Sequence, residues 1–147
     1  MSDKKQKIII VNGPNINLVG EREVGVYGKE SYQDIMREVA EYAEKCGFGC
    51  EIFQSNGEGA IIDKLHSVRK EVAGVVINAG AYTHYSYAIR DAIAAIRIPC
   101  VEVHLSNIFD RDEFRSRTVI GPVCCGTISG LGKNSYLLAV DALKRIL

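Results

Sequence analysis

Short runs of β-branched and other apolar residues alternate in this chain with longer stretches of helical periodicity, and this alternation constrains the fold most. Such an order is typical of repeated β-α units that build a parallel sheet. The runs are nearly continuous in apolar residues, as expected for strands covered on both faces. We therefore predict five buried parallel strands, at Lys7–Asn12, Cys50–Gln54, Gly74–Asn78, Pro99–His104 and Val123–Ile128.

Four other segments carry apolar residues at helical spacing. The first helix follows Ser31 and Asp34, which are placed as a capping pair, and we expect Thr83 to cap the third. The apolar positions are Ile35, Val39, Tyr42, Ala43 and Cys46; Ile61, Leu65, Val68 and Val72; Ala88, Ile89, Ala92, Ile93 and Ile96; and Leu137, Val140, Leu143 and Leu147. A chain of 147 residues without linker or repeat suits one domain. We predict a three-layer α/β/α domain over residues 1–147, doubly wound in the flavodoxin-like strand order.

Composition argues against several classes of function. Lys plus Arg and Asp plus Glu number 18 each, so no bulk positive field attracts nucleic acid or membranes. The apolar runs are far shorter than the roughly 20 residues that span a bilayer, and the run after the first lysines is too short for a signal peptide. Five cysteines without C-x-x-C spacing argue against disulfides and structural zinc. We expect a cytoplasmic protein in which Cys100, Cys124 and Cys125 are buried thiols.

Polar residues stand at the carboxyl ends of four of the predicted strands, at 12–15, 54–56, 78–80 and 104–107. The carboxyl ends of parallel strands form the edge at which such sheets bind ligands. Turn chemistry alone also favours Asn, Ser and Gly in loops, so any one of these residues has an ordinary structural explanation. Their joint placement nevertheless predicts a polar site at this edge.

Charged residues cluster around the end of the fourth strand. Glu102 and His104 are two apart and share a face, so the carboxylate can orient the imidazole and favour its protonated form, which suits a general acid. Arg111 and Arg115 are four apart and could hold an anionic or polyhydroxylated ligand together. The alternatives are a rim pair without chemistry and surface ion pairs with the acidic residues at 110, 112 and 113.

The stretch 13–30 has no clear periodicity and is longer than most connections in compact domains, which is typical of a lid. It carries Arg22 and Tyr27, with glycines around them that would permit hinge motion. A tyrosine with its usual pKa of about 10 is a poor base, but an adjacent guanidinium favours the phenolate. We expect a mobile active-site lid over 13–30 that carries a candidate base; a merely solvated or packed pair is the alternative.

Motifs for other chemistries are missing. The segment 130–134 lacks the first glycine and the final Ser/Thr of a phosphate loop, and no G-x-G-x-x-G follows the first strand. His84, Glu102 and His104 form only a weak metal set. We predict no metal and no organic cofactor. A flavodoxin-like binding protein that holds flavin mononucleotide is the alternative, although the first strand is not followed by a Ser/Thr-rich phosphate loop.

Several separated motifs stand in this order: Asn12-Gly-Pro-Asn-Ile-Asn-Leu-Val-Gly20, Arg22-Glu23 with Tyr27-Gly28, Gln54-Ser-Asn56 with Glu58-Gly59, Asn78-Ala-Gly-Ala-Tyr-Thr-His84 with Arg90-Asp91, and Glu102-Val-His-Leu-Ser-Asn107 with Arg111 and Glu113-Phe-Arg115. In them the chain resembles the type II 3-dehydroquinate dehydratases, or type II dehydroquinases, over nearly its whole length. The resemblance implies a cofactor-free hydro-lyase that converts 3-dehydroquinate to 3-dehydroshikimate by anti elimination through an enolate. Such an enzyme serves the shikimate pathway of aromatic amino acid biosynthesis, or quinate catabolism.

The resemblance also implies roles for individual residues. The Tyr27 phenolate would remove the C2 proton, with its pKa lowered by Arg22, while Asn15 holds the water that stabilises the enolate oxygen. His104 would protonate the departing C1 hydroxyl. Asn78 would position this histidine and the leaving group, and Glu102 would orient it from behind. The implied binding residues are Leu105 and Ser106 for the substrate carboxylate, through their backbone amides, His84 and Arg115 for the ring hydroxyls, and Asp91 of a neighbouring subunit.

The family assembles as a homododecamer, a tetramer of trimers, and the resemblance implies the same here. This sequence departs from the usual pattern at a few positions: Val24, Gly57, Tyr85, Cys124 and Cys125. Val24 stands where the lid commonly has proline, which raises the conformational freedom of the open and unfolded chain. None of the departures removes an implied catalytic group.

Overall fold

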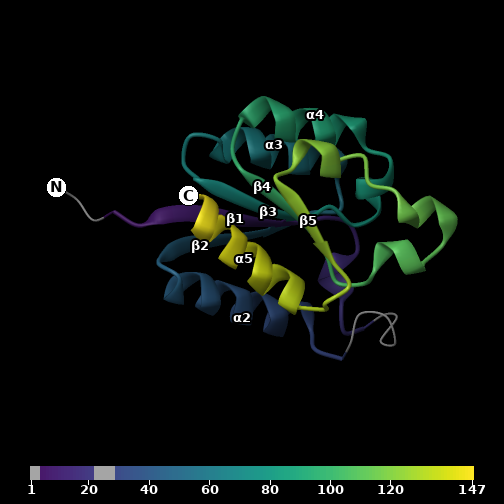
Figure 1. Cartoon of the computed structure of the whole chain (residues 1–147), viewed down its shortest axis with the longest axis horizontal. Coiled ribbons are helices and arrows are strands. Elements are labelled where there is room, and N and C mark those ends of the chain that lie inside the picture. The colour runs from purple at the N-terminus through teal and green to yellow at the C-terminus, as the bar shows by residue number, and fades with distance from the viewer. Residues whose placement is uncertain (1–3, 22–28) are drawn as a thin grey trace.

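A sheet of five parallel strands in the order β2-β1-β3-β4-β5 forms the centre of the molecule (Figure 1). The structure is a computed structural model that describes residues 4–21 and 29–147. The strands are β1 (Gln6–Asn12), β2 (Phe48–Gln54), β3 (Gly74–Asn78), β4 (Cys100–His104) and β5 (Gly126–Ser129). The predicted flavodoxin-like α/β fold is confirmed, including the strand order.

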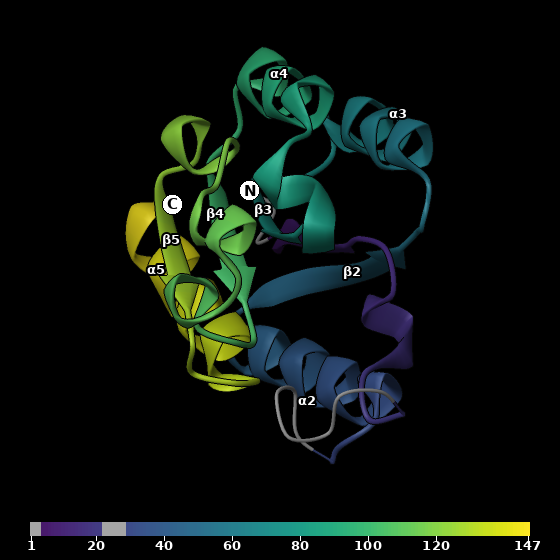
Figure 2. The same ribbon diagram turned by 90° about the vertical axis from the view of Figure 1, so that its right-hand side faces the viewer.

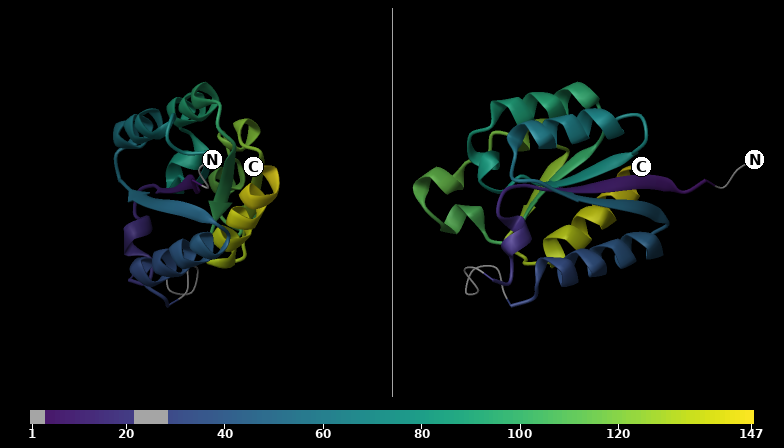
Figure 3. Two further views of the ribbon diagram at one scale, coloured as in Figure 1. Left: turned by 90° about the vertical axis from the view of Figure 1, so that its left-hand side faces the viewer. Right: turned by 180° about the vertical axis from the view of Figure 1, so that it is seen from behind.

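Two helical layers cover the sheet (Figure 3). On one face lie α2 (Tyr32–Lys45) and α5 (Asn134–Ile146), and on the other α3 (Glu58–Val68) and α4 (Tyr87–Ile96). Alternate residues of β1 enter the two cores, because side chains on a strand point to opposite faces. Ile8 and Ile10 pack under α2 and α5, and Ile9 and Val11 under α3 and α4. No helix in the described part of the chain is long and apolar enough to cross a membrane.

The edge strands differ from the prediction of five fully covered strands. The residues of β3 and β4 are all buried, whereas β2 is mostly half-buried and β5 is exposed or half-buried. The last strand begins at Gly126 and not at Val123, since Gly121–Val123 forms a 3-10 turn with a proline in its first turn. Cys125 is exposed and Cys124 half-buried, so of the three cysteines expected inside only Cys100 is buried.

Of the two helix caps predicted from the sequence, one is confirmed and one is wrong. Ser31 caps α2 as predicted and accepts the amide of Asp34 at 3.1 Å. The predicted cap of α4 was wrong: Ser86, not Thr83, accepts the amide of Ile89, at 3.0 Å. Thr83 lies in the preceding 3-10 turn and points its hydroxyl inward, because it donates a hydrogen bond to the buried carboxylate of Glu102.

The described beginning of the predicted lid is packed against the body of the domain. Residues Ile16–Leu18 form a short 3-10 helix, and the side chains of Ile16 and Val19 are buried in the core. The amide of Tyr32 donates to the carbonyl of Val19 at 3.0 Å. Gly20 has a φ of +95°, and a Cβ there would lie 2.7 Å from the carbonyl oxygen of Glu30. The fold therefore holds this part of the segment to the start of α2.

Candidate active site

The carboxyl ends of the strands bring the polar residues predicted from sequence to one edge of the sheet, which Figure 2 shows face on. Asn12 and Asn78 are register partners on β1 and β3. The amide of Gly13 donates to the carbonyl of Asn78 at 2.7 Å, and a Cβ at Gly13 would lie 2.4 Å from the carbonyl oxygen of Ala79. Glycine thus lets the loops after these two strands meet closely above the sheet.

A pocket opens at this edge between the loops that follow β1, β3 and β4. It is lined by Pro14, Asn15, Ile16, Asn78, Gly80, Ala81, His84, His104, Leu105, Ser106, Ile108, Arg111 and Arg115. The lining includes every residue after β1, β3 and β4 that we expect to touch the ligand. These residues are Asn15, Asn78, His84, His104, Leu105, Ser106 and Arg115. The pocket is therefore the place where their chemistry can act together.

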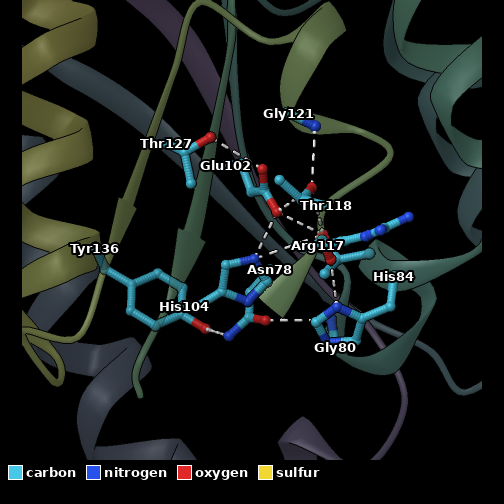
Figure 4. A network of polar contacts seen from close by, with 11 residues as sticks. Asn78, Gly80, His84, Glu102, His104, Arg117, Thr118, Gly121, Thr127 and Tyr136 are labelled. Carbon is cyan, nitrogen blue, oxygen red and sulfur yellow. Dashed lines mark hydrogen bonds and ion pairs between the residues drawn. The ribbon is translucent and has the colours of Figure 1, made fainter. Parts of the chain in front are cut away.

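His104 and Glu102 form a buried pair at the end of β4 (Figure 4). The imidazole Nε2 lies 2.6 Å from the carboxylate Oε2, and both side chains are almost completely buried. This confirms the predicted orientation of the imidazole by the carboxylate. Because Nε2 faces Glu102, Nδ1 is the ring nitrogen left for a ligand, and it makes no hydrogen bond to the described residues.

Three threonines complete the surroundings of the Glu102 carboxylate. Thr83 and Thr118 donate to Oε2 at 2.5 and 2.8 Å, and Thr127 donates to Oε1 at 3.0 Å. Burial by itself raises the pKa of Glu102, but the hydrogen bonds from His104 and the threonine hydroxyls outweigh it and bring the pKa below its usual value. The carboxylate is thus ionised and can stabilise a positive charge on His104.

His84 lies beside His104 with nearly parallel rings, whose centroids are 6.5 Å apart. Its Nδ1 lies 2.6 Å from the carbonyl oxygen of Arg117, so Nδ1 carries the hydrogen and Nε2 of the neutral ring is an acceptor. Burial lowers the pKa of His84. The hydrogen bond to Arg117 raises this pKa, but the nearby His104 and Arg115 lower it, and the net effect is a decrease. A neutral His84 can accept a hydrogen bond from a ligand hydroxyl.

Arg115 contributes a guanidinium to the same pocket. Its Nε lies 3.6 Å from Oδ2 of Asp112, and its Cζ lies 4.7 Å from the ring centroid of Phe114. The ion pair predicted as an alternative therefore exists, yet Arg115 lines the pocket at the same time. The role of Arg115 in holding a ligand stays a prediction.

Of the predicted substrate-binding residues that the structure describes, one lies outside this pocket. Asp91 is exposed on α4 and does not line the pocket. Arg22 and Tyr27 lie outside the described residues.

Sequence reasoning missed the residues that support the site from behind. Thr118 and Thr127 reach Glu102 across 16 and 25 residues of sequence, and no local pattern announces such contacts. Tyr136 reaches Asn78 across 58 residues. Its position in the buried face of a helix was the available signal, since a buried phenol needs a hydrogen-bond partner.

The described residues contain no group of three or more His, Cys, Asp or Glu side chains arranged to hold a metal ion. The weak set of His84, Glu102 and His104 does not form one, because His84 directs its Nδ1 to the carbonyl of Arg117 and Glu102 is enclosed by hydroxyl donors. The pocket offers the imidazole of the His104–Glu102 pair, amides and the guanidinium groups of Arg111 and Arg115.

Fold and pocket together define a class of protein: a flavodoxin-like α/β domain with a buried carboxylate–imidazole pair at the carboxyl edge of its sheet. The profile of the family described as "Dehydroquinase class II" matches residues 6–144. The chain belongs to this family. The flavin-binding alternative is thereby set aside.

Similar proteins agree with this assignment over nearly the full length. A 3-dehydroquinate dehydratase of Caldicellulosiruptor bescii is 54% identical over 143 residues, which are 97% of this chain and 99% of the relative. The one of Thermotoga maritima is 50% identical over 139 residues, 95% of each chain. The crystal structure of the type II dehydroquinase from Butyrivibrio crossotus superposes with a TM-score of 0.93 at 48% identity and covers 95% of this chain and 97% of that one.

Proposed function

We propose that this protein is a cofactor-free hydro-lyase that converts 3-dehydroquinate to 3-dehydroshikimate in the shikimate pathway or in quinate catabolism. Family membership and the named relatives support the substrate. The observation that carries the chemistry is the His104–Glu102 pair, 2.6 Å apart, at a pocket that also holds Asn15, Asn78, His84 and Arg115.

The acid half of the elimination falls to His104. Protonated on both nitrogens, it donates one hydrogen to the ionised Glu102 and presents the other, on Nδ1, to the C1 hydroxyl. This hydroxyl then leaves as water, and the developing neutral imidazole keeps its orientation through Glu102. Asn78, at the floor of the same pocket, positions the leaving group.

The base half falls to Tyr27. Its phenolate takes the proton from C2, and Arg22 stabilises the phenolate. Both belong to the segment 13–30, which we propose as the lid. Its first residues are packed in the core, where they would anchor it. Loss of the C2 proton produces an enolate, whose oxygen is stabilised by a water held by Asn15.

The remaining pocket residues bind the substrate. The backbone amides of Leu105 and Ser106 take its carboxylate, and His84 and Arg115 take its ring hydroxyls. A neutral His84 supports this role, because its Nε2 can accept a hydroxyl hydrogen.

We further propose a homododecamer of four trimers in which Asp91 reaches the site of a neighbouring subunit. The exposed position of Asp91, away from the pocket of its own chain, supports this arrangement. A cytoplasmic location fits the five cysteines, which are all free thiols.

Incubation with 3-dehydroquinate tests the activity directly. The conjugated enone of the product absorbs in the ultraviolet, so turnover gives a rising absorbance; a flat trace from folded protein would contradict the proposal. Borohydride added during turnover should leave the enzyme active and unmodified, because no lysine forms an imine with the substrate in this mechanism.

Tyr27→Phe tests the base. Removing the phenolate should lower kcat roughly 10²- to 10⁴-fold, the usual contribution of a general base, and leave the free energy of unfolding near that of the unmodified protein. Kinetics and urea unfolding measure the two effects. Near-normal kcat would assign proton removal to another group.

A further inference from the structure

A row of buried side-chain hydrogen bonds runs beneath the pocket and joins four elements of the fold. Asn78 on β3 donates from Nδ2 to the hydroxyl of Tyr136 on α5 at 2.9 Å (Figure 4). Tyr136 donates to Oδ1 of Asn12 on β1 at 2.7 Å. Asn12 in turn points its Nδ2 to the hydroxyl of Tyr32, 3.3 Å away, and to Sδ of Met36, 3.4 Å away, both on α2. Only Asn78 of these residues lines the pocket.

The hydrogen-bonding capacities of these groups admit one arrangement. The backbone amide of Gly80 can only donate, and it lies 3.2 Å from the side-chain oxygen of Asn78, which fixes that end of the amide as Oδ1. The other end, Nδ2, therefore faces Tyr136. A phenol has one hydrogen, and since Asn78 offers a donor, Tyr136 accepts there and gives its own hydrogen to Asn12.

Burial makes this arrangement costly to break. Asn12, Asn78 and Tyr136 are 0, 2 and 0% exposed. A flipped Asn78 amide would set a donor against the amide of Gly80. It would also set an acceptor against the phenol oxygen of Tyr136, whose hydrogen is already donated to Asn12, so two buried hydrogen bonds would be lost. Burial also raises the pKa of Tyr136 well above its usual value, so the phenol stays neutral and keeps both of its roles.

We propose that Tyr136 is a positioning residue of the dehydration: it holds the Asn78 amide in the one orientation that presents its remaining hydrogen and lone pair to the ligand. This inference rests on the proposed function, in which Asn78 positions the leaving group. Tyr136 itself touches no substrate. It acts from the C-terminal helix and is in turn held by Asn12 and, through it, by Tyr32.

Tyr136→Phe is the direct test. The variant keeps the ring that fills the core and removes the oxygen between Asn78 and Asn12. We expect kcat to fall roughly 10- to 100-fold, the range for a misplaced group in an active site, while KM changes less than about threefold. An unchanged kcat would overturn the proposal.

Tyr42→Phe is the matched control. Tyr42 also joins α2 to α5, through a hydrogen bond of its hydroxyl to Oδ1 of Asp141 at 2.6 Å, and it does not line the pocket. Its loss should leave kcat unchanged at a comparable cost in stability, which urea unfolding measures. Equal losses of kcat in both variants would mean that any weakened contact between these helices has the same effect, and would overturn the specific role of Tyr136.

A double-mutant cycle tests the route of the effect. If Tyr136 acts through Asn78, Tyr136→Phe should lower kcat little further in an Asn78→Ala background, whereas independent roles would make the two losses multiply. Should Tyr136→Phe fail to fold, Asn12→Ala takes its place in the cycle, since it removes the acceptor of the phenol from outside the pocket. Multiplying losses would overturn the proposal in either version.

A readout without turnover separates this inference from the proposed function. In the unmodified protein the side-chain amide hydrogens of Asn78 should exchange slowly with solvent in NMR spectra, and in Tyr136→Phe they should exchange faster, with Tyr42→Phe unchanged. Equal exchange in all three would overturn the positioning role. Absence of turnover in the unmodified protein, together with slow exchange at Asn78, would contradict the proposed function alone.

Discussion

At the scale of single residues, the Glu102 carboxylate shows how a charge is kept inside this molecule. Its oxygens accept from one imidazole and three hydroxyls, so the hydration lost on burial is replaced by fixed donors. The loop after Thr118 can approach because residue 121 is a glycine: a Cβ there would lie 3.1 Å from Oε1 of Glu102 and 2.8 Å from Cγ2 of Thr118. The ionised state of Glu102 is thus a property of its surroundings.

Glu102→Gln should change how stability depends on pH. The pKa of Glu102 is lower in the folded protein than its usual value of 4.5, so the unfolded chain binds the proton more tightly and acid favours unfolding. Its contribution to stability is complete above pH 4.5 and is lost as the pH falls through 4.5 towards the folded-state pKa. The variant should therefore be less stable than the unmodified protein at pH 7, and the gap should narrow in acid.

Urea unfolding at several pH values from 7 down to about 4 measures this gap. Glu71→Gln is the control, because Glu71 is exposed and stands away from the pocket. Its curve should follow that of the unmodified protein at each pH. A gap for Glu102→Gln that stays constant through this range would show that the charge of Glu102 does not stabilise the fold.

At the scale of elements, the N-terminus of α4 links two helices and the site. Ser86 accepts the amide of Ile89 as a cap and also donates its own hydroxyl hydrogen to Oε2 of Glu58 in the first turn of α3. The residues just before it, from Gly80 to His84, form the 3-10 turn that carries Thr83 to Glu102 and His84 to the pocket. The start of α4 therefore fixes the position of that turn.

Ser86→Ala should destabilise the protein more than Ser31→Ala. Loss of a cap alone costs about 1 kcal/mol, and Ser31, which caps α2 near the surface, should lose about that much. Ser86→Ala additionally leaves the carboxylate of Glu58 without its donor, so we expect a loss of about 2 kcal/mol or more. Urea unfolding of the two variants makes the comparison, and an equal loss would mean that the bond to Glu58 adds nothing.

The same elements show what could be predicted from the sequence. The strand ends and the Glu102–His104 pair were found because they depend on local patterns: apolar runs that stop at polar residues, and a spacing of two on a strand. Ser31 and Thr83 looked equally good as caps. The choice of Ser86 over Thr83 depends on a carboxylate 19 residues beyond Thr83, and the start of β5 depends on its pairing with β4. Such contacts join distant parts of the chain and leave no local signal.

At the scale of the whole molecule, the exposed surface of α4 around Asp91 bears on our proposal that a neighbouring chain completes the site. Tyr85 and Tyr87, near Asp91 at the start of α4, are 59 and 64% exposed. Exposed aromatic side chains are enriched on surfaces that another chain covers. They support the proposal that Asp91 serves the pocket of a neighbour.

Asp91→Asn and His104→Ala should therefore complement each other. Each variant alone should be nearly inactive, but in mixed assemblies a chain with intact His104 can receive Asp91 from a partner that lacks His104. Random mixing at equal amounts should restore about one quarter of the sites. The restored activity is measured in a turnover assay on mixed assemblies, which are purified after co-expression of the two chains with different tags. Inactive mixed assemblies, or a fully active Asp91→Asn variant, would contradict a role of Asp91 in the site of a neighbouring chain.

The contact between the loops after β1 and β3 also protects Asn12 from deamidation. Asn12 is followed by Gly13, and Asn-Gly is the dipeptide most prone to deamidation. In this reaction the backbone nitrogen of the glycine attacks the side-chain amide of the asparagine, and ammonia is lost. In the native fold that nitrogen is engaged by the carbonyl of Asn78 and the amide by two tyrosines, so attack is blocked. Once unfolded, the chain loses this protection, and each molecule that converts Asn12 to aspartate brings a negative charge into the dry interior on refolding. Deamidation should therefore accumulate in denatured protein at Asn12, the residue that holds Tyr136 beneath the pocket.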